Sequence, residues 1–327
     1  MQAAVLTAFA QPLELKEIAT PSAGKGQVLV RVAASGVNPL DTKIVAGKAE
    51  HAQQQPGAVL GIDLAGTVAA VGEGVIGFAP GDEVYGMTGG VGGVPGSLAQ
   101  YGAVDADLLA HKPRNLSLRE AAAMPLIFIT AWEGLVDRAQ TKAGMTVLVH
   151  GGAGGVGHMA VQLAKSLGAT VYATGSKHQR EIIEGYGATF IDYTKSSVED
   201  YVGQYTGGEG FDVVYDTVGG ATLDLSFRAA KRYTGHVVSC LGWGTHALAP
   251  LSFRAATYSG VFTLLPLLSG RGRAHHGEIM RAAAALAEAG QLTVQTDPAR
   301  YTLATVNDAH TALIERTAHG KLVIDVA

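Results

Sequence analysis

A glycine-rich stretch near the middle of the chain has the residue types and spacing of a phosphate-binding turn. The residues Gly152-Ala153-Gly154-Gly155-Val156-Gly157 fit the pattern Gly-x-Gly-x-x-Gly, which alone is a weak signal. An apolar run at 147–149 precedes the pattern, an amphipathic helical segment follows it, and a second apolar run at 171–173 completes a β-α-β unit. We therefore expect Gly152 to allow a tight turn, Gly154 to let a pyrophosphate approach the backbone, and Gly157 to let helix and strand pack closely. Free N–H groups at the helix N-terminus would hold the anion.

The residues after the second strand of this unit indicate which dinucleotide it binds. A site for NAD places Asp or Glu there, about 20 residues after the first glycine, to hold the ribose hydroxyls. Gly175 stands at that place, and no carboxylate lies between Thr170 and Arg180. Ser176, Lys177 and Arg180 could instead bind a 2′-phosphate. The sequence predicts NADP(H), with a solvated basic turn as the alternative.

The elements that must position these residues change in character near residue 118. Before it, short β-like runs alternate with turns rich in Gly, Pro, Asn and Asp, which is typical of a small barrel. After it, apolar strands alternate with helix-length segments, which predicts a parallel sheet covered on both faces. We expect an α/β protein with a β-barrel domain over residues 1–120, a nucleotide-binding domain over 121–268, and a return to the first domain over 269–327. A helical stretch broken at Pro125 and a strand at 291–294 are also expected.

Composition excludes several classes of protein. The net charge is −4 and the basic residues are dispersed, which argues against a nucleic-acid surface. The single cysteine excludes an intrachain disulfide and suits a reducing compartment. The N-terminus lacks the pattern of a signal peptide, and the longest apolar run, 121–132, is too short to span a bilayer. We expect a soluble cytoplasmic protein.

Seven segments spread over nearly the whole chain resemble the medium-chain dehydrogenase/reductase superfamily, and most closely its zinc-free quinone oxidoreductases, which are related to zeta-crystallin. These segments are GQVLVRVAASGVNPLD, GIDLAGTVAAVGEGV, PGDEVYG, TAWEGLV, VLVHGGAGGVGHMAVQLAK, DVVYDTVGG and AHGKLVI. The resemblance implies a GroES-like catalytic domain, a Rossmann domain inserted into it, and an active site in the cleft between them. It also implies a homodimer formed through the edges of the Rossmann sheets.

The residues at the family's zinc positions argue against a catalytic metal. Alcohol dehydrogenases of this superfamily bind zinc with Cys, His and a second thiolate. Here Asn38 stands where the first Cys would be, and Gly61-Ile62-Asp63 stands where Gly-His-Glu would be. Catalytic zinc needs three protein ligands, so we expect no metal. Hydride would then go to an acceptor that is already electron-poor, either a quinone or the β-carbon of an α,β-unsaturated carbonyl compound.

The resemblance also implies which residues surround the cofactor. Asn38 and Asp41 would lie near the nicotinamide, and Thr130 would touch the ring or its ribose. Asn38 suits equally a turn before Pro39. Lys43 stands where some relatives have a tyrosine and could orient an oxygen of the acceptor. The remaining implied cofactor contacts are Tyr193, Thr217, Val218, Cys240, Leu241, Leu264 and Arg316.

Three further side chains have two interpretations each. Cys240 suits buried packing better than a reactive thiol. Met87 and Trp243 either shape the acceptor pocket or pack in the core.

The leading functional interpretation is an NADPH-dependent quinone reductase that needs no metal and forms no covalent intermediate. An NADPH-dependent alkene reductase acting on enals, enones or acrylates would use the same cleft and cofactor. A nucleotide-binding protein without catalytic activity is an alternative of another class, against which the intact glycine pattern and dispersed charge weigh. The sequence leaves open the physiological acceptor, the part played by Lys43 and any assembly beyond a dimer.

Overall fold

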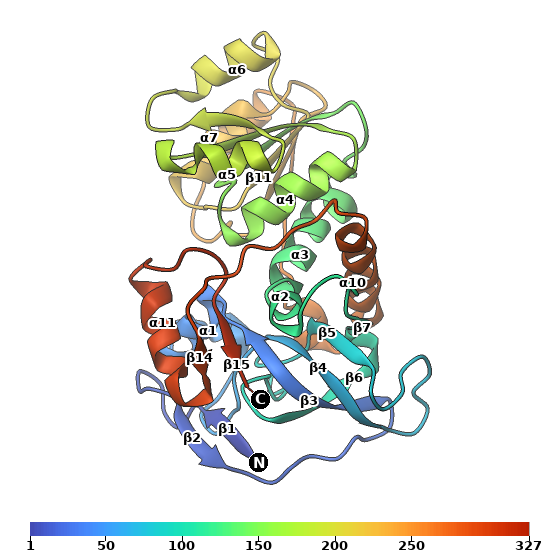
Figure 1. Ribbon diagram of the computed structural model, residues 1–327. Coiled ribbons are helices and arrows are strands. Elements are labelled where there is room, and N and C mark those ends of the chain that lie inside the picture. The colour runs from blue at the N-terminus through green and yellow to red at the C-terminus, as the bar shows by residue number, and fades with distance from the viewer. Residues whose placement is uncertain (327) are drawn as a thin grey trace. The chain divides into compact units, whose positions relative to one another are not determined.

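The computed structural model describes residues 1–326, and the chain divides into two units. The first unit comprises Met1–Leu126 and the residues from Leu264 to the C-terminus, and the second comprises Ile127–Thr263. The chain therefore leaves the first unit once and returns to it (Figure 1). Helix α3 (Pro125–Trp132) begins in the first unit and continues in the second.

The first unit contains a seven-stranded sheet with the path β14-β15-β3-β4-β5-β7, on which β6 also pairs with β3. Only the β14–β15 pair in this sheet is parallel. Strand β3 shows why these residues form a sheet with a buried face: Val28, Val30 and Val32 are fully buried and alternate with less buried neighbours. The strands are β3 (Gln27–Gly36), β4 (Asp63–Val71), β5 (Glu83–Met87), β6 (Tyr101–Asp105), β7 (Ala110–His111), β14 (Tyr301–Thr302) and β15 (Val323–Asp325). A separate hairpin pairs β1 (Gln2–Val5) with β2 (Glu14–Glu17).

The helices of the first unit include α2, which ends just before α3 begins at Pro125, so the helix break predicted at this proline is confirmed. These helices are α1 (Pro39–Val45), α2 (Leu118–Ala122), α9 (Leu265–Ser269), α10 (Arg273–Glu288) and α11 (Val306–Ile314). Short 3₁₀ turns are η1 (Glu50–Ala52), η2 (Ala106–Leu108) and η5 (Leu303–Thr305).

The last strand brings the C-terminal segment beside the N-terminal part of the chain. β15 pairs antiparallel with β3, with Val323 opposite Gly36 and Asp325 opposite Ala34 (Figure 1). Arg119 Nη1 donates to Asp325 Oδ1 at 2.9 Å and holds this segment in place. As a result, the residue two positions before Val323, Lys321, lies next to the turn that follows β3.

The second unit is built on a six-stranded parallel sheet in the order β10-β9-β8-β11-β12-β13. The chain starts at β8, runs outward to β10 and then returns to β11 on the other side, so the strand order reverses between β8 and β11. The strands are β8 (Thr146–His150), β9 (Thr170–Gly175), β10 (Thr189–Asp192), β11 (Val213–Asp216), β12 (His236–Ser239) and β13 (Thr257–Gly260). Leu148, Val214 and Val237 of the central strands are buried among the aromatic rings of Phe211 and Phe227.

The helices of the second unit connect these parallel strands, as such connections require. They are α4 (Gly155–Ser166), α5 (Arg180–Gly185), α6 (Val198–Thr206), α7 (Ala221–Ala229) and α8 (Ala249–Ser252). The 3₁₀ turn η4 (Lys177–Gln179) precedes α5, and α3 continues into a π-helical turn, η3 (Glu133–Arg138).

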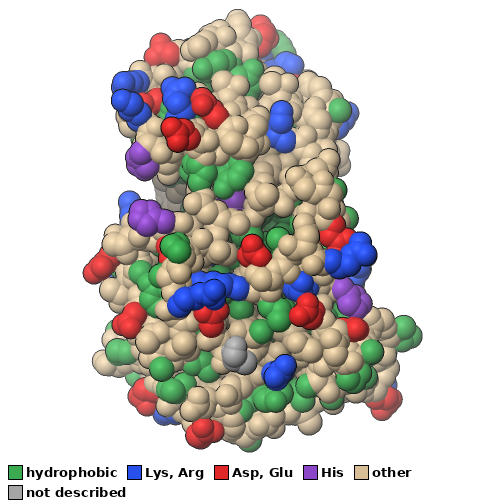
Figure 2. Space-filling model, viewed as in Figure 1, with side chains coloured by type: hydrophobic (Ala, Val, Ile, Leu, Met, Phe, Trp, Pro, Cys, Tyr) green, Lys and Arg blue, Asp and Glu red, His purple; other side chains and the backbone are tan. Residues whose placement is uncertain are grey.

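Two general features bear on function. No helix within residues 1–326 is long and apolar enough to cross a membrane. On the face shown in Figure 2, acidic and basic side chains are interspersed instead of forming a large patch of one sign.

The segment 291–294 is not a strand, so that prediction was wrong. Leu292 is buried while its neighbours are exposed, which gives the alternating pattern. The segment nevertheless forms no β-ladder, and the nearest strand-like contact is an isolated bridge between Thr296 and Lys321.

Candidate functional site

Most of the cofactor residues predicted in the second unit follow the carboxyl ends of parallel strands. The glycine turn follows β8, the basic turn follows β9, Tyr193 follows β10, Thr217 and Val218 follow β11, and Cys240 and Leu241 follow β12. In open parallel sheets, ligands bind outside this edge, at the point where the strand order reverses. That point lies here between β8 and β11.

The glycines of this turn differ in why a side chain is excluded. The left-handed backbone conformation lies on Gly151 (φ 74°) and not on Gly152, where we expected the tight turn. Gly152 is required because a Cβ there would lie 2.5 Å from the Cβ of Ala173, and a Cβ on Gly157 would overlap the carbonyl oxygen of Gly151. A Cβ on Gly154 would meet nothing closer than that same oxygen, at 3.2 Å. That contact is tight, so a side chain there would need a small shift of the turn, whereas Gly154 itself is exposed at the N-terminus of α4.

The residues after β11 lie against this turn. Thr217 Oγ1 donates to the carbonyl oxygen of His150 at 2.6 Å. A Cβ built on Gly151 would lie 3.0 Å from Val218 Cγ2 and 3.2 Å from Thr217 Oγ1. The structure therefore brings Thr217 and Val218 together with the glycine turn.

Asp216 fixes the loops that follow two neighbouring strands, and sequence reasoning missed it. Its fully buried carboxylate accepts hydrogen bonds from the backbone N–H groups of Val218 and Gly219 and from Ser239 Oγ at 2.7 Å. Ser239 Oγ in turn accepts from the N–H of Leu241. An acidic residue ending the apolar run "DVVYD" was the available sequence signal.

His150 supports the glycine turn as a neutral side chain. Burial lowers the pKa of His150 to about 4, against the opposing influence of the nearby Asp216. Its Nδ1 lies 3.2 Å from Thr174 Oγ1, and the same oxygen accepts the N–H of Gly151 at 3.1 Å. The end of β8 is thus tied to β9 directly before the turn.

After β9, Ser176 precedes the 3₁₀ turn η4, Lys177 begins that turn, and Arg180 begins α5. Ser176 Oγ bonds Gln179 Oε1 at 3.1 Å, while the side chain of Lys177 is exposed. Arg180 donates to Glu184 Oε1 at 3.0 Å, and its guanidinium lies over the ring of Phe190. A Cβ on Gly175 would lie 2.6 Å from Ile183 Cδ1, so an acidic side chain would have to displace the packed Ile183.

Tyr193 is exposed and Cys240 is half-buried. Tyr193 is 60% exposed, and its N–H bonds the carbonyl oxygen of Gly175, which places it beside the end of β9. Burial raises the pKa of the Cys240 thiol to about 12 and its Sγ faces the carbonyl oxygen of Asp216. The Trp243 ring is half exposed and stands edge-on to Phe262.

Thr130 lies in α3 just before the π-helical turn and is buried. Its Oγ1 lies 3.1 Å from Thr263 Oγ1, which donates to Glu133 Oε2 at 3.0 Å. Its carbonyl oxygen accepts the hydroxyl of Tyr215 at 2.6 Å. Thr130 is therefore held by α3, by the π-helical turn and by β11.

In the first unit, Asn38 and Asp41 belong to a buried polar cluster that also contains Asp63 and Lys321. Asn38 Nδ2 donates to Asp63 Oδ2 at 2.9 Å, and its backbone N–H donates to Asp41 Oδ2 at 2.8 Å. Lys321 Nζ donates to Asn38 Oδ1 and lies 3.7 Å from Asp63 Oδ2. Burial raises the pKa of both carboxyls, that of Asp41 to about 7. Sequence reasoning did not single out Asp63 or Lys321 as functional residues.

The other candidates of the first unit have varied surroundings. Lys43 is exposed on α1, and burial together with the charge of Lys43 lowers the pKa of His51. Met87 is fully buried in β5. Leu264 is buried and Arg316 is exposed after α11, and their contacts with a cofactor stay a prediction.

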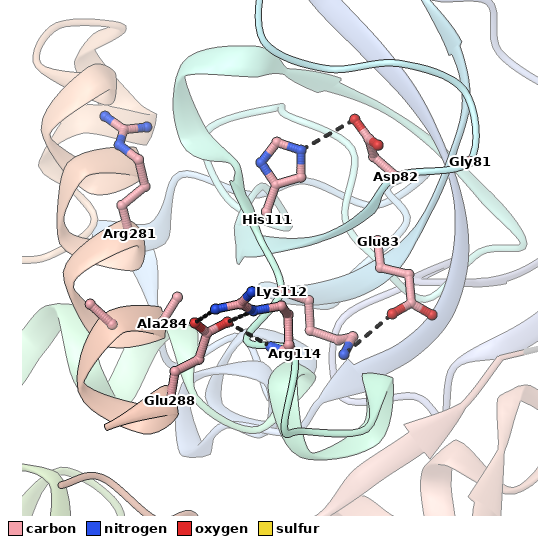
Figure 3. Close-up of a pocket in the computed structure, with 10 residues that line it drawn as sticks. Gly81, Asp82, Glu83, His111, Lys112, Arg114, Arg281, Ala284 and Glu288 are labelled. Atoms are coloured by element: carbon pink, nitrogen blue, oxygen red, sulfur yellow. Dashed lines mark hydrogen bonds and ion pairs between the residues drawn. The ribbon is translucent and has the colours of Figure 1, made fainter. Parts of the chain in front are cut away.

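The first unit also has a cavity of about 740 Å³ beside α10. Most of its charged side chains lie against one of opposite sign or a polar partner: Arg114 and Lys112 form ion pairs with Glu288 and Glu83, and His111 Nε2 lies 3.2 Å from Asp82 Oδ2 (Figure 3). None of the ten residues that line it is a candidate from the sequence.

Comparison with known proteins places this geometry in a family. A profile of the alcohol dehydrogenase GroES-like domain matches residues 24–114, and one described as zinc-binding dehydrogenase matches residues 186–324. The NADPH-dependent alkenal/one oxidoreductase of Arabidopsis thaliana is 36% identical over 94% of this chain and 74% of its own length. The chain belongs to the medium-chain dehydrogenase/reductase superfamily.

Solved structures of this superfamily confirm the expected fold. An alcohol dehydrogenase superfamily protein from Novosphingobium aromaticivorans is 54% identical, covers all of both chains and has a TM-score of 0.98. The quinone oxidoreductase from Coxiella burnetii is 28% identical over 100% of this chain and 99% of its own, with a TM-score of 0.82. As a medium-chain dehydrogenase/reductase, the protein has a GroES-like N-terminal domain and a Rossmann-type parallel sheet. It is an NAD(P)-dependent oxidoreductase.

The residues of this medium-chain dehydrogenase/reductase fit a dinucleotide but not a catalytic zinc. Gly154 is exposed at the N-terminus of α4 and at the carboxyl edge of β8, which suits a pyrophosphate. By contrast, the side chains at the family's zinc positions are Asn38 and Ile62, and Lys321 donates to Asn38. Within residues 1–326, no group of three or more His, Cys, Asp or Glu side chains could hold a metal ion.

Proposed function

We propose that this protein is an NADPH-dependent, metal-independent reductase of the activated double bond in α,β-unsaturated carbonyl compounds. The observation that carries the proposal is the buried cluster at the zinc positions, where Lys321 and Asp63 bind Asn38. Without a Lewis acid, the acceptor must already be electron-poor. The likeness to the alkenal/one oxidoreductase of Arabidopsis, at 36% identity, favours an enal or enone over other acceptors.

The second unit would bind the cofactor along the carboxyl edge of its sheet. The glycine turn would hold the pyrophosphate, and Ser176, Lys177 and Arg180 would bind the 2′-phosphate. Bound NADPH would supply the hydride. The other proposed contacts are Tyr193, Thr217 and Val218 on the adenine side, and Thr130, Cys240, Leu241, Leu264 and Arg316 elsewhere along the cofactor. In this proposal, residues 1–120 and 269–327 form the catalytic domain and residues 121–268 the NADP-binding domain.

Lys43 would orient the acceptor. Its ammonium is exposed on α1 and could donate a hydrogen bond to a carbonyl oxygen. Negative charge develops on that oxygen as the β-carbon accepts hydride, so a fixed cation stabilises the transition state more than the ground state. At the start of α1, the backbone N–H of Asn38 donates to Asp41 Oδ2 and its carbonyl oxygen accepts the N–H of Asp41, and these bonds fix the helix that carries Lys43.

A panel of enals, enones, acrylates and quinones, each tested for oxidation of NADPH, decides the proposal. We expect enals and enones to be reduced at the carbon–carbon double bond, with the carbonyl retained in the product. Lys43→Met should lower kcat/KM for enones by about tenfold or more and leave NADPH binding unchanged. Absence of turnover with every enal, enone and acrylate would refute the proposal.

Quinone reduction is the second candidate. The likeness to the quinone oxidoreductase from Coxiella burnetii supports it. Quinones are also electron-poor conjugated carbonyl compounds, so the same site chemistry would serve them. Turnover of quinones alone in the panel would select this function, and binding of NADPH without any turnover would favour a non-catalytic role.

We also propose a homodimer. Strand β13 lies at the end of the six-stranded sheet, so one side of its backbone is available for a second copy. Light scattering after size-exclusion chromatography should give twice the chain mass of 33.6 kDa.

A further inference from the structure

The Asn38 cluster, defined as Asn38, Asp41, Asp63 and Lys321, joins three parts of the first unit that are distant in sequence. Asn38 precedes α1, Asp63 begins β4, and Lys321 precedes β15. Lys321 and Asn38 are 283 residues apart. All four residues are at least nine-tenths buried. The C-terminal segment thus supplies a cation to the interior of the N-terminal domain.

The cluster fixes the orientation of the side-chain amide of Asn38. An amide presents an oxygen that accepts and a nitrogen that donates, and these exchange places when it flips. Lys321 has only donors, and the ionised carboxylate of Asp63 has only acceptors. Their positions therefore require Oδ1 to face Lys321 and Nδ2 to face Asp63, as observed. Removal of the lysine would remove one of these two constraints.

The same carboxylate also reaches the start of α3. Asp63 Oδ1 accepts the backbone N–H of Leu126 at 2.8 Å, while its Oδ2 accepts from Asn38. Leu126 is the last residue of the first unit before the chain enters the second. Asp63 is therefore hydrogen-bonded to the N-terminal ends of two helices: to Asn38, the N-cap of α1, and to Leu126, the second residue of α3.

The buried carboxylate of Asp63 needs a cation beside it. An unpaired buried charge is strongly destabilising, and a paired one is held at a defined position. Lys321 is the cation whose ammonium lies within 4 Å of Asp63 in the described part of the chain. Its side chain is only 7% exposed, so it acts through its buried partners.

We propose that Lys321 is a positioning residue for reduction of the acceptor. It fixes the amide of Asn38, whose backbone N–H and carbonyl oxygen both bond Asp41 at the start of α1, and so holds the first turn from which Lys43 meets the acceptor. This inference rests on the proposed function for its catalytic consequence. Its structural part, the fixed amide, does not depend on any activity.

The side-chain amide of Asn38 can be observed directly. The chain contains three asparagines, Asn38, Asn115 and Asn307, so protein labelled with ¹⁵N-asparagine gives three pairs of side-chain NH₂ signals, which single substitutions assign. We expect the Asn38 amide protons to exchange slowly with solvent. In Lys321→Met, exchange should become faster by about tenfold or more, since one of its two side-chain partners is gone.

Lys112 provides a matched control. It is in the same unit, its side chain is also 7% exposed, and its Nζ donates to the carbonyl oxygens of Pro113 and Leu116. Lys112→Met should leave the exchange of the Asn38 amide unchanged. If Lys321→Met does not fold, the charge-balanced variant Lys321→Met/Asp63→Asn is used, and it should also lose the slow exchange.

Kinetics then test the route through Asn38. Lys321→Met should lower kcat/KM for the acceptor by about tenfold while the Kd of NADPH changes by less than about twofold, and Lys321→Arg should recover part of the loss. If the lysine acts through Asn38, Lys321→Met/Asn38→Ala should be no worse than the poorer single variant, because the two losses are not additive. Unchanged amide exchange in Lys321→Met, or losses that multiply, would overturn the proposal. Failure of the wild-type protein with every acceptor would refute the proposed function only, since the exchange measurement stands without it.

Discussion

The guanidinium of Arg180 lies over the ring of Phe190, 4.6 Å from its centre. Arg180 begins α5, directly after the basic turn, and Phe190 lies in the neighbouring strand β10. The stacking and the bond to Glu184 hold the guanidinium at the end of the sheet where a 2′-phosphate is expected. A guanidinium has five N–H donors, so these contacts leave donors for a phosphate.

The first prediction concerns cofactor choice. NADPH should bind about tenfold or more tightly than NADH, because one charge-assisted hydrogen bond contributes about 1.5–3 kcal/mol and about 1.4 kcal/mol is a factor of ten. Arg180→Ala should remove most of this preference and leave NADH binding unchanged, as measured by fluorescence titration. Arg228→Ala is a suitable control, since Arg228 is a half-exposed arginine of the same unit that pairs with Glu199. Equal affinity of the wild-type protein for both cofactors would refute the assignment.

The second prediction is that activity needs no metal. The ammonium of Lys321 binds Asn38 at the place of the first zinc ligand, and the second such position is the apolar Ile62. Dialysis against a strong chelator should leave NADPH turnover unchanged. Activity that is lost on dialysis and restored by added zinc would reveal a site that this donor set does not explain.

The third prediction is that Cys240 is not a nucleophile. Only the thiolate is nucleophilic, and burial raises the pKa of this thiol to about 12. Cys240→Ser should change the single-turnover rate only modestly, whereas NADPH deuterated at the transferred position should slow the same step. An inactive Cys240→Ser protein that still folds and binds NADPH would contradict direct transfer.

The fourth prediction concerns the packing that holds Thr130. A Cβ on Gly134 would lie 2.5–2.8 Å from ring and hydroxyl atoms of Tyr215, whose hydroxyl donates to the carbonyl oxygen of Thr130. Gly134→Ala should therefore lower the free energy of unfolding by about 1–3 kcal/mol through overpacking and also reduce turnover. Gly203→Ala in α6 is the control: nothing lies within 4 Å of its new Cβ, and alanine favours the helix by up to about 1 kcal/mol. Equal stability of the two variants in denaturant titrations would argue against this packing.

The features that sequence could predict are those with local causes. The parallel strands, the glycine turn and the helix break at Pro125 follow from apolar runs, bare backbone and a missing N–H, all visible within a few residues. The positive φ on Gly151 was assigned one residue too late, because spacing alone does not say which glycine of a run turns.

The residues that sequence could not predict depend on distant partners. Asp63 and Lys321 look like an ordinary acid and base until β15 pairs with β3 and places them together. Asp216 needs the neighbouring strand β12 to bring Ser239 to its carboxylate. The strand predicted at 291–294 was wrong because its alternating pattern has another cause. Leu292 is buried by packing, but no neighbouring strand pairs with the segment.

The fifth prediction follows from the raised pKa of Asp41, about 7 in the folded protein against an ordinary value near 3.8. Burial is the main cause, the charge of Asp63 adds to it, and the N–H of Asn38 and the ammonium of Lys321 oppose it. Between about pH 4 and 7 the folded protein keeps a proton that the unfolded chain has released, so this carboxyl makes the free energy of unfolding fall as pH rises.

Asp41→Asn cannot ionise, and so the variant should gain stability relative to the wild-type protein between pH 5 and pH 7.5. A tenfold change in an acid dissociation constant corresponds to about 1.4 kcal/mol, so the stability difference due to this carboxyl should be at most about 4 kcal/mol at pH 7.5, of which about 2.5 kcal/mol arises between pH 5 and pH 7.5. His150 and His310, whose pKa values burial lowers to about 4, make both proteins more stable as pH rises from 4 to 6.5. They are present in both proteins, so their contribution cancels when urea unfolding of the two is compared at each pH. A stability difference that does not change with pH would mean that Asp41 is ionised throughout this range, with Lys321 and the N–H of Asn38 outweighing its burial.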